Sequence, residues 1–163
     1  MMVAVFYIVL RYTWSVVRAP AARNIDYRAL ADFRYEIRRF LNFSEQAARV
    51  AGIEPRQHQA LLAIKGLPRE SKATVGTLAE RLRIRHHSAV ELTNRLARKG
   101  WMRRSRGRTD RREVLLQLTP RGENLLAQLS LSHRNELRTA GPRLIASLQT
   151  AVAHHRRPRR GRR

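Results

Sequence analysis

The chain has 163 residues, enough for one compact domain with a buried core but too few for two enzyme-sized domains. It carries 34 lysines and arginines against 12 acids, a net charge of +22 that favours a polyanionic partner, most commonly nucleic acid. A generally solvated basic surface is the alternative explanation for the charge alone. The absence of cysteine excludes disulfides, thiolate zinc sites and thiol-based redox switches within the chain.

Residues 1–24 open with an apolar run, 1–10, which is too short to span a bilayer and ends at Arg11. A secretory signal would carry its positive charges before the apolar core, whereas Arg11 and Arg18 follow it. Three interpretations stay open: an extra helix on the core or at a dimer contact, a weak membrane contact, or residues added by an upstream start codon. The break at 20–24 favours an appendage without a function, and we expect no membrane partner.

Residues 25–54 are predicted to form a long amphipathic helix that ends near Gly52. Its apolar stripe follows three- and four-residue spacing through Leu30, Phe33, Ile37, Phe40, Leu41, Ser44 and Ala48. A second helix is predicted to begin at Glu54-Pro55, because proline is tolerated in a first turn. Its inner face would contain His58, Leu61, Leu62 and Ile64. Residues 66–74 then form a turn-rich loop.

Two short helices joined by a tight turn are predicted next, over 75–82 and 86–99. The apolar spacing buries Leu78, Ala79 and Leu82 in the first helix, and Ala89, Leu92, Thr93 and Leu96 in the second. The residues left on the outward face of the second helix are Arg85, His86, His87, Ser88, Val90, Glu91, Asn94, Arg95 and Arg98. Gly100 is placed to end this helix in a left-handed conformation.

Strands are predicted at 101–105 and 113–118, and the loop between them, 106–112, is too highly charged to be buried. Two short helices followed by a basic hairpin make a winged helix-turn-helix, a fold that presents one helix to a DNA groove. The expected fold class is therefore mostly α, with a two-stranded wing, and the DNA-binding region spans 55–119.

Residues 120–153 are predicted to form C-terminal dimerisation helices, with Thr119 as N-cap and Pro120 at the first helical position. Gly141-Pro142 is expected to interrupt them. The inner positions are Leu125, Leu126, Leu129 and His133 in the first helix, and Leu144, Ile145, Leu148 and Val152 in the second. The basic stretch 154–163 has no apolar anchor and is expected to be a disordered tail that contacts phosphates without sequence preference.

The apolar stripes of residues 26–52 and 123–152 are too wide for one 45-residue winged unit to cover. A second copy of the chain would cover them, which predicts a homodimer with a two-fold helical interface. The alternative is a monomer whose terminal helices pack only on each other.

Several short segments also carry a family resemblance. In order, they are Leu78-Ala79-Glu80-Arg81-Leu82, Ser88-Ala89-Val90, Arg95-Leu96, Lys99-Gly100, Asp110-Arg111-Arg112 and Leu118-Thr119-Pro120-Arg121-Gly122. In order and spacing they resemble the MarR family of bacterial transcription regulators, and the likeness extends more loosely from Asp26 to Val152. The resemblance implies a dimer built from terminal helices, a repressor by default, and release by a small-molecule effector. It also places a ligand pocket between the dimer helices and the DNA-reading unit, which here would involve Phe40, Phe43, His58 and Leu62, although their spacing fits ordinary core equally.

The expected partner is double-stranded DNA, and the candidate DNA-binding residues lie on the second short helix and in the wing. They are Arg85, His86, His87, Ser88, Val90, Glu91, Arg95, Arg106, Arg108, Asp110, Arg111 and Arg112. Side chains such as serine, valine and arginine suit base edges and phosphates, and arginines around a glycine bend suit a minor groove. The resemblance assigns Asp110 and Arg112 to bracing the wing and approaching the minor groove.

Two residues depart from the family pattern. Glu91 stands where a basic or neutral residue is common, and it would either accept from cytosine N4 or pair with Arg95 one turn away. Arg83 stands where glycine is frequent in the turn, so we expect a slightly different turn shape. His86 and His87 converge poorly on a metal because adjacent helical side chains point about 100° apart.

The sequence thus predicts a dimeric, sequence-specific transcriptional regulator located in the cytoplasm at the nucleoid. The alternative is a basic nucleoid or RNA-binding protein without sequence preference. No catalytic residues, metal site or cofactor are expected, because no nucleophile–base pairing, phosphate loop or metal-ligand spacing is present.

Overall fold

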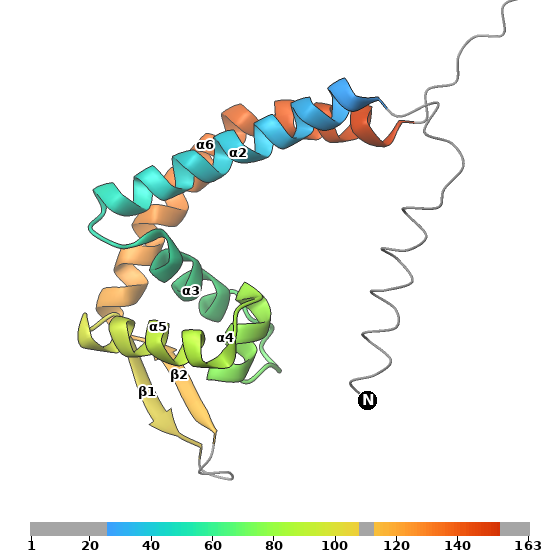
Figure 1. Cartoon of the computed structure of the whole chain (residues 1–163). Coiled ribbons are helices and arrows are strands. Elements are labelled where there is room, and N and C mark those ends of the chain that lie inside the picture. Colours follow the sequence, from blue (N-terminus) through green and yellow to red (C-terminus); the bar gives the residue numbers. More distant parts are fainter. Residues whose placement is uncertain (1–25, 108–112, 154–163) are drawn as a thin grey trace, which may run out of the picture.

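A computed structural model describes residues 26–107 and 113–153 (Figure 1). The elements run in the order α2 (Tyr27–Val50), α3 (Pro55–Lys65), α4 (Val75–Leu82), α5 (His86–Arg98), β1 (Met102–Arg106), β2 (Val114–Leu118) and α6 (Pro120–Val152). The predictions for residues 1–24, for the wing-tip residues Arg108, Asp110, Arg111 and Arg112, and for the tail at 154–163 lie outside the described residues.

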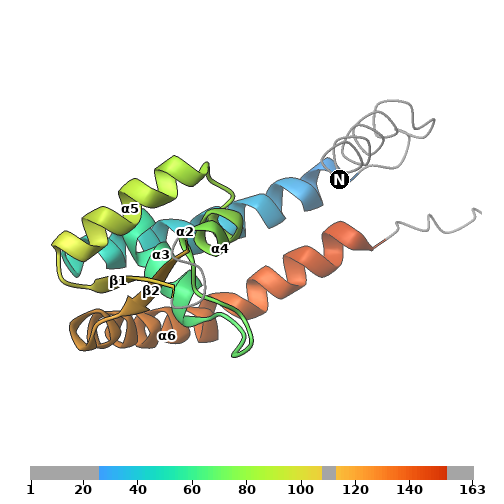
Figure 2. The same ribbon diagram turned by 90° about the horizontal axis from the view of Figure 1, so that it is seen from below.

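The described residues form two connected parts. Helices α3, α4 and α5 and the β1–β2 hairpin form a compact unit, and α2 extends from it alongside the C-terminal part of α6 (Figures 1 and 2). The fold is mostly helical with one two-stranded antiparallel sheet, as the sequence predicted. Among the described residues, none of the helices has both the length and the apolar character that a bilayer crossing requires.

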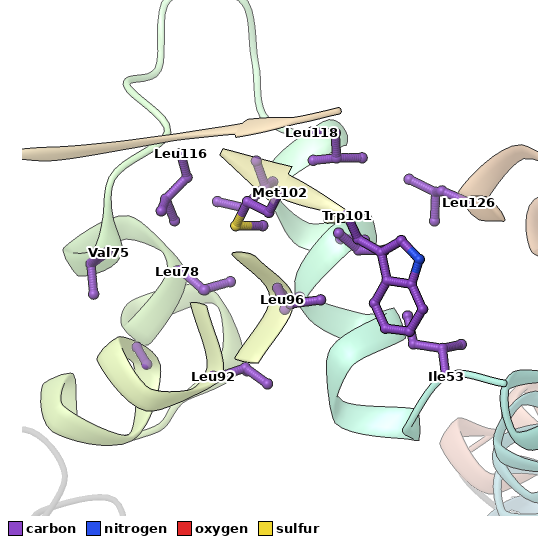
Figure 3. Close-up of a cluster of buried hydrophobic side chains, with 14 of the residues drawn as sticks. Ile53, Val75, Leu78, Leu92, Leu96, Trp101, Met102, Leu116, Leu118 and Leu126 are labelled. Carbon is purple, nitrogen blue, oxygen red and sulfur yellow. The ribbon is translucent and has the colours of Figure 1, made fainter. Parts of the chain in front are cut away.

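The core of the compact unit is a cluster of apolar side chains from every one of its elements (Figure 3). Leu61, Leu78 and Leu96 are fully buried at the centre of the three helices, and Met102 joins them from β1. The Trp101 side chain belongs to the same cluster as Leu126 of α6, which ties the long helix to this unit. Full burial of a side chain of this size stabilises the fold by about 1.5–3 kcal/mol.

The hairpin pairs Met102 with Leu118 and Arg106 with Val114. Residues 73–74, which the sequence had suggested to be part of a turn-rich loop, form a third extended segment beside β2. Thr74 forms an isolated bridge with Leu115, and the Leu116 amide donates to the Ala73 carbonyl at 2.7 Å. The wing is therefore anchored to the residues that begin α4.

The long C-terminal helix corrects one prediction, because α6 is a single helix of 33 residues with Pro142 inside it. Gly141-Pro142 does not divide it into two. Proline removes one backbone hydrogen bond, but contacts with α2 hold the helix together on both sides. Ala140 is buried, and Arg143 lies 3.8 Å from Glu36 of α2.

The start of α6 confirms the predicted cap: the Thr119 hydroxyl accepts from the Gly122 amide at 3.1 Å, with Pro120 at the first helical position. Gly122 itself lies against the backbone of Trp101. A Cβ at Gly122 would stand 2.0 Å from the Trp101 carbonyl oxygen, so only glycine fits here. Strand β1 and helix α6 approach each other at this point.

Candidate nucleic-acid interface

Helix α5 buries one face and exposes the other, as predicted. Ala89, Thr93 and Leu96 are fully buried, and Leu92 is nearly so. The residues exposed on the opposite face are Arg85, His86, His87, Glu91, Arg95 and Arg98, with Ser88, Val90 and Asn94 half-buried. Gly100 ends the helix with a φ of 71°, as expected. All the α5 residues predicted to read DNA are thus on one accessible or partly accessible side.

The N-terminus of α5 has no side-chain cap of the kind found at α2, α4 and α6. Asp26, Thr74 and Thr119 cap α2, α4 and α6 through side-chain oxygens, whereas Arg85 at the start of α5 provides no such acceptor. The first amide groups of α5 therefore face outward next to two exposed histidines, with the positive end of the helix dipole. An acceptor such as a base edge or a phosphate oxygen suits this position.

The structure supports one of the two roles expected for Glu91. Its carboxylate lies 3.6 Å from the Arg95 guanidinium, one turn further along α5. Both side chains are well exposed, so the pair contributes only about 0.3–0.5 kcal/mol to stability. Its main effect is to orient Arg95 on the outward face of the helix.

The turn between α4 and α5 keeps a left-handed residue where the sequence departs from the family pattern. Arg83 has φ 51° and ψ 45° and ends α4. The backbone of this turn therefore has the left-handed conformation that glycine usually adopts, although the residue here is Arg83.

Strand β1 places further arginines beside α5. Arg103, Arg104, Ser105 and Arg106 are all exposed, and only Met102 of this strand is buried. Arg104 also lines a hollow of about 260 Å³ together with His86 and Val90 of α5. Sequence reasoning selected Arg106 and missed Arg103 and Arg104, although three arginines in a five-residue strand next to one buried residue could have indicated them.

The base of the wing is braced by an ion pair. The Lys72 ammonium lies 3.0 Å from the Glu113 carboxylate, across the contact between the 66–74 loop and β2. This exposed pair joins the base of the wing to the loop before α4 and contributes less than about 1 kcal/mol to stability.

The residues predicted to form a ligand pocket are only partly brought together. Phe40 and Phe43 of α2 each lie edge-on to His133 of α6, with ring centroids 6.1 and 5.8 Å away. The His58 ring lies 4.9 Å from the same imidazole. Leu62 is 49% exposed, so its predicted place on the inner face of α3 is wrong. The buried side of α3 is centred on Gln57, Leu61 and Ile64, which follow four- and three-residue spacing, and Leu62 points about 100° away from Leu61 toward solvent.

His133, which sequence reasoning placed only in the core, is the centre of this cluster. Its Nδ1 donates to the Leu129 carbonyl, and its Nε2 is hydrogen-bonded to the Ser44 hydroxyl at 2.7 Å. Burial, with a smaller contribution from the neighbouring His133, lowers the pKa of His58 from 6.5 to about 4. Next to the cluster, Phe43, Ala47, Leu129 and Ser132 help to line an open hollow of about 470 Å³.

Two short helices at a tight turn, a second helix with an open face, and a basic two-stranded hairpin anchored beside it define a winged helix-turn-helix protein. The model of the MarR family matches residues 51–113, which confirms the resemblance over α3, the two short helices α4 and α5, and the first strand of the hairpin. Members of that family are transcription regulators, in agreement with the expectation that this chain is not an enzyme. No sequence among the curated proteins matches the chain.

Solved structures share the fold over most of the chain at low sequence identity. AbsC, a MarR family transcriptional regulator from Streptomyces coelicolor, is similar with a TM-score of 0.67 at 15% identity, over 82% of this chain and 93% of that one. A mutant of S. aureus MepR, solved bound to an oligodeoxyribonucleotide, gives 0.58 at 18%, over 72% and 91%. A mutant of MarR from E. coli, solved in complex with operator DNA, gives 0.56 at 19%, over 74% and 90%.

Proposed function

We propose that the protein is a dimeric transcriptional regulator that binds specific sequences in double-stranded DNA through α5 and the wing. The observation that carries the proposal is the face of α5, on which exposed arginines and histidines surround a helix N-terminus without a side-chain cap. Such a face can enter a major groove, with Ser88 and Arg95 near base edges and the first amides near phosphates.

Strand β1 supports the same assignment from a second element. Its exposed arginines would follow the backbone beside the major groove, while the hairpin extends toward the adjacent minor groove. Phosphate contacts of this kind supply affinity and position the reading helix, and the few contacts with base edges supply the specificity.

Exposed apolar residues on α2 and α6 support the dimer. Leu137, Ile145, Leu148 and Val152 are 43–64% exposed and follow helical spacing on one side of α6, away from the residues that contact α2. Leu30 and Leu41 are similarly exposed on α2. A two-fold interface would cover both sets and would place the two α5 helices about one DNA turn apart, near 10–10.5 base pairs between half-site centres.

Repression, and its release by a small molecule, extend the proposal. A dimer bound across a promoter blocks polymerase, and the hollow beside Phe43 and His133 lies between α2 and α6, where a ligand would alter the spacing of the reading helices. The protein acts on nucleoid DNA in the cytoplasm in this proposal.

Competition between DNA sequences tests the proposal directly. The full-length protein is titrated onto the promoter of its own gene at physiological salt, with random duplex of equal length as competitor. Specific binding predicts that random DNA competes at least about 10³-fold less well than the promoter site. Equal competition would instead support the second candidate, a basic nucleoid or RNA-binding protein, which the net charge of +22 favours.

A further inference from the structure

Three helices of the described chain end in the same way, and one of them does so with an arginine. After α2, the Gly52 and Ile53 amides donate to the carbonyls of Arg49 and Ala48, each at 3.0 Å. After α5, Gly100 and Trp101 donate to Ala97 and Leu96 at 3.0 and 3.1 Å. This pair of bonds requires a left-handed residue, and the two glycines have φ values of 75° and 71°.

Arg83 occupies the equivalent position after α4. Its amide donates to the Glu80 carbonyl at 3.1 Å, and the Ile84 amide donates to Ala79 at 3.0 Å. Arg83 is the one non-glycine residue with positive φ among the described residues. In this conformation the Cβ atom crowds the neighbouring carbonyl oxygen, so a side chain here destabilises the fold relative to glycine.

The fold fixes the backbone at this position but gives the arginine side chain no compensating role within it. The turn must be tight, because Leu78 and Ala79 before it and Ala89 after it are all buried in one core. Arg83 itself is exposed. The ion pairs formed by arginines of the described residues involve Arg28, Arg39, Arg49, Arg95 and Arg143, but not Arg83.

The position of Arg83 suggests what the side chain contacts instead. It lies two residues before Arg85, at which α5 begins, and three before His86, so its Cα is at most about 11 Å from that end of the helix. Arg81, Arg83 and Arg85 are all exposed around this turn. A long guanidinium side chain here reaches the phosphates that flank a groove occupied by the start of α5.

We propose that Arg83 is a phosphate contact at the edge of the major groove, held in a strained conformation that lowers the stability of the free protein. This inference rests on the proposed function. Because the contact is made to backbone, it supplies affinity for all duplex sequences and not discrimination between them. In the dimer it acts twice, once in each half-site.

Four variants test the contact. Arg83→Gly removes the charge and the strain, Arg83→Asn removes the charge but retains a side chain that tolerates the left-handed region, and Arg83→Lys keeps the charge. Arg28→Gln removes one charge whose side chain is 93% exposed at the start of α2, far from the reading helix (Figure 1), and is the control for net charge. Affinity for the promoter and for random duplex is measured by fluorescence anisotropy between about 50 and 200 mM salt, together with thermal unfolding of the free protein.

We expect Arg83→Gly to have two opposite effects: the free protein becomes more stable, and its affinity for DNA decreases. Arg83→Gly raises Tm by about 2–4 °C and lowers affinity for both duplexes on the order of tenfold at low salt. The slope of log affinity against log salt becomes shallower by about 1.8, which is 0.9 for each of two lost phosphates. Arg83→Asn gives the same loss of affinity, and Arg83→Lys retains most of the slope.

Two other results would have different meanings. If Arg83→Gly binds both duplexes with unchanged affinity and slope while the wild type binds DNA normally, the phosphate contact is refuted and the proposed function stands. If the wild-type protein binds no duplex at all, the proposed function fails first.

Discussion

At the scale of single residues, the close approach of Gly122 to β1 can be tested by adding one methyl group. Gly122→Ala places a Cβ 2.0 Å from the Trp101 carbonyl oxygen. Because the backbone fixes the positions of both atoms, the contact can be relieved only by moving α6 away from the residues that lead into β1. We expect a loss of at least about 3 kcal/mol in the free energy of unfolding, measured by chemical denaturation.

Gly141→Ala is the matched control, because nothing lies within 4 Å of a Cβ at Gly141 and the residue is in the same helix. Removing a glycine from a helix interior should stabilise the protein by about 0.5–1 kcal/mol. If the two substitutions changed stability equally, helix propensity and not the contact with Trp101 would determine the effect of replacing Gly122.

The lowered pKa of His58 predicts that the protein becomes less stable in acid. Its pKa is lowered from 6.5 to about 4, so between these pH values the unfolded chain binds a proton that the folded protein does not. Stability is therefore retained above pH 6.5 and falls as the pH decreases from 6.5 toward 4, by up to about 3 kcal/mol in total.

The measurement compares urea unfolding of wild type and His58→Phe across this pH range. The variant keeps an aromatic ring against His133 but has no group to titrate, so its stability should fall less steeply with acid. Parallel curves for the two proteins would show that other groups account for the whole acid effect.

At the scale of secondary structure elements, local sequence predicted the short helices well. The limits of α4, 75–82, agree with the prediction because Thr74 caps it and the buried positions Leu78 and Ala79 follow helical spacing. Gly100 and Thr119 likewise mark boundaries by their own backbone and side-chain chemistry. Where the end of a helix is set by residues close to it in the chain, the sequence alone predicts where that end lies.

The errors lie where a distant segment decides the outcome. Proline usually breaks a helix, but α6 continues past Pro142 because contacts with α2 stabilise it there. The bridge between Thr74 and Leu115 joins residues 41 positions apart, and no local pattern contains it. His133 has neighbours from α2 and α3 that only the folded chain brings to it. Of the candidate interface, the face of α5 was therefore predictable, whereas the adjoining strand arginines were only partly so.

Pro142 also makes a prediction at this scale. Pro142→Ala restores a backbone donor within α6 and removes the clash of the ring with the preceding turn, so we expect a gain of about 1–3 kcal/mol in the free energy of unfolding. Pro68→Ala, in the exposed loop before α4, is the control and should change stability by less than about 1 kcal/mol. A destabilised Pro142→Ala would indicate that the dimer or the fold requires a bend at this position.

At the scale of the whole molecule, the exposed apolar face of α6 predicts the oligomeric state. Leu148 and Ile145 are 44% and 57% exposed in the single chain, and a charge at either position would have to be desolvated in a two-fold interface. We expect Leu148→Glu to dissociate the dimer in analytical ultracentrifugation and to weaken promoter binding at least about tenfold, because a monomer loses the second half-site.

Thr150→Glu places the same charge nearby on α6, at an exposed position outside the apolar stripe. This control should leave the mass and the binding of the protein unchanged. A wild-type protein that sediments as a monomer at micromolar concentration would refute the dimer without affecting the assignment of α5.

The continuity of α6 gives the molecule a mechanical linkage. The helix starts two residues after β2 ends, with only Thr119 between them, and its 33 residues span about 50 Å. Its first turn is locked to the backbone beside the wing at Gly122, and its far end carries the apolar residues proposed to meet a second copy. A rotation of about 5° at that far end would displace the wing by about 4 Å, comparable to the rise of one base pair. A small rotation of one subunit relative to the other would thus move the wing by about one base pair, and the protein would no longer fit both half-sites of its DNA.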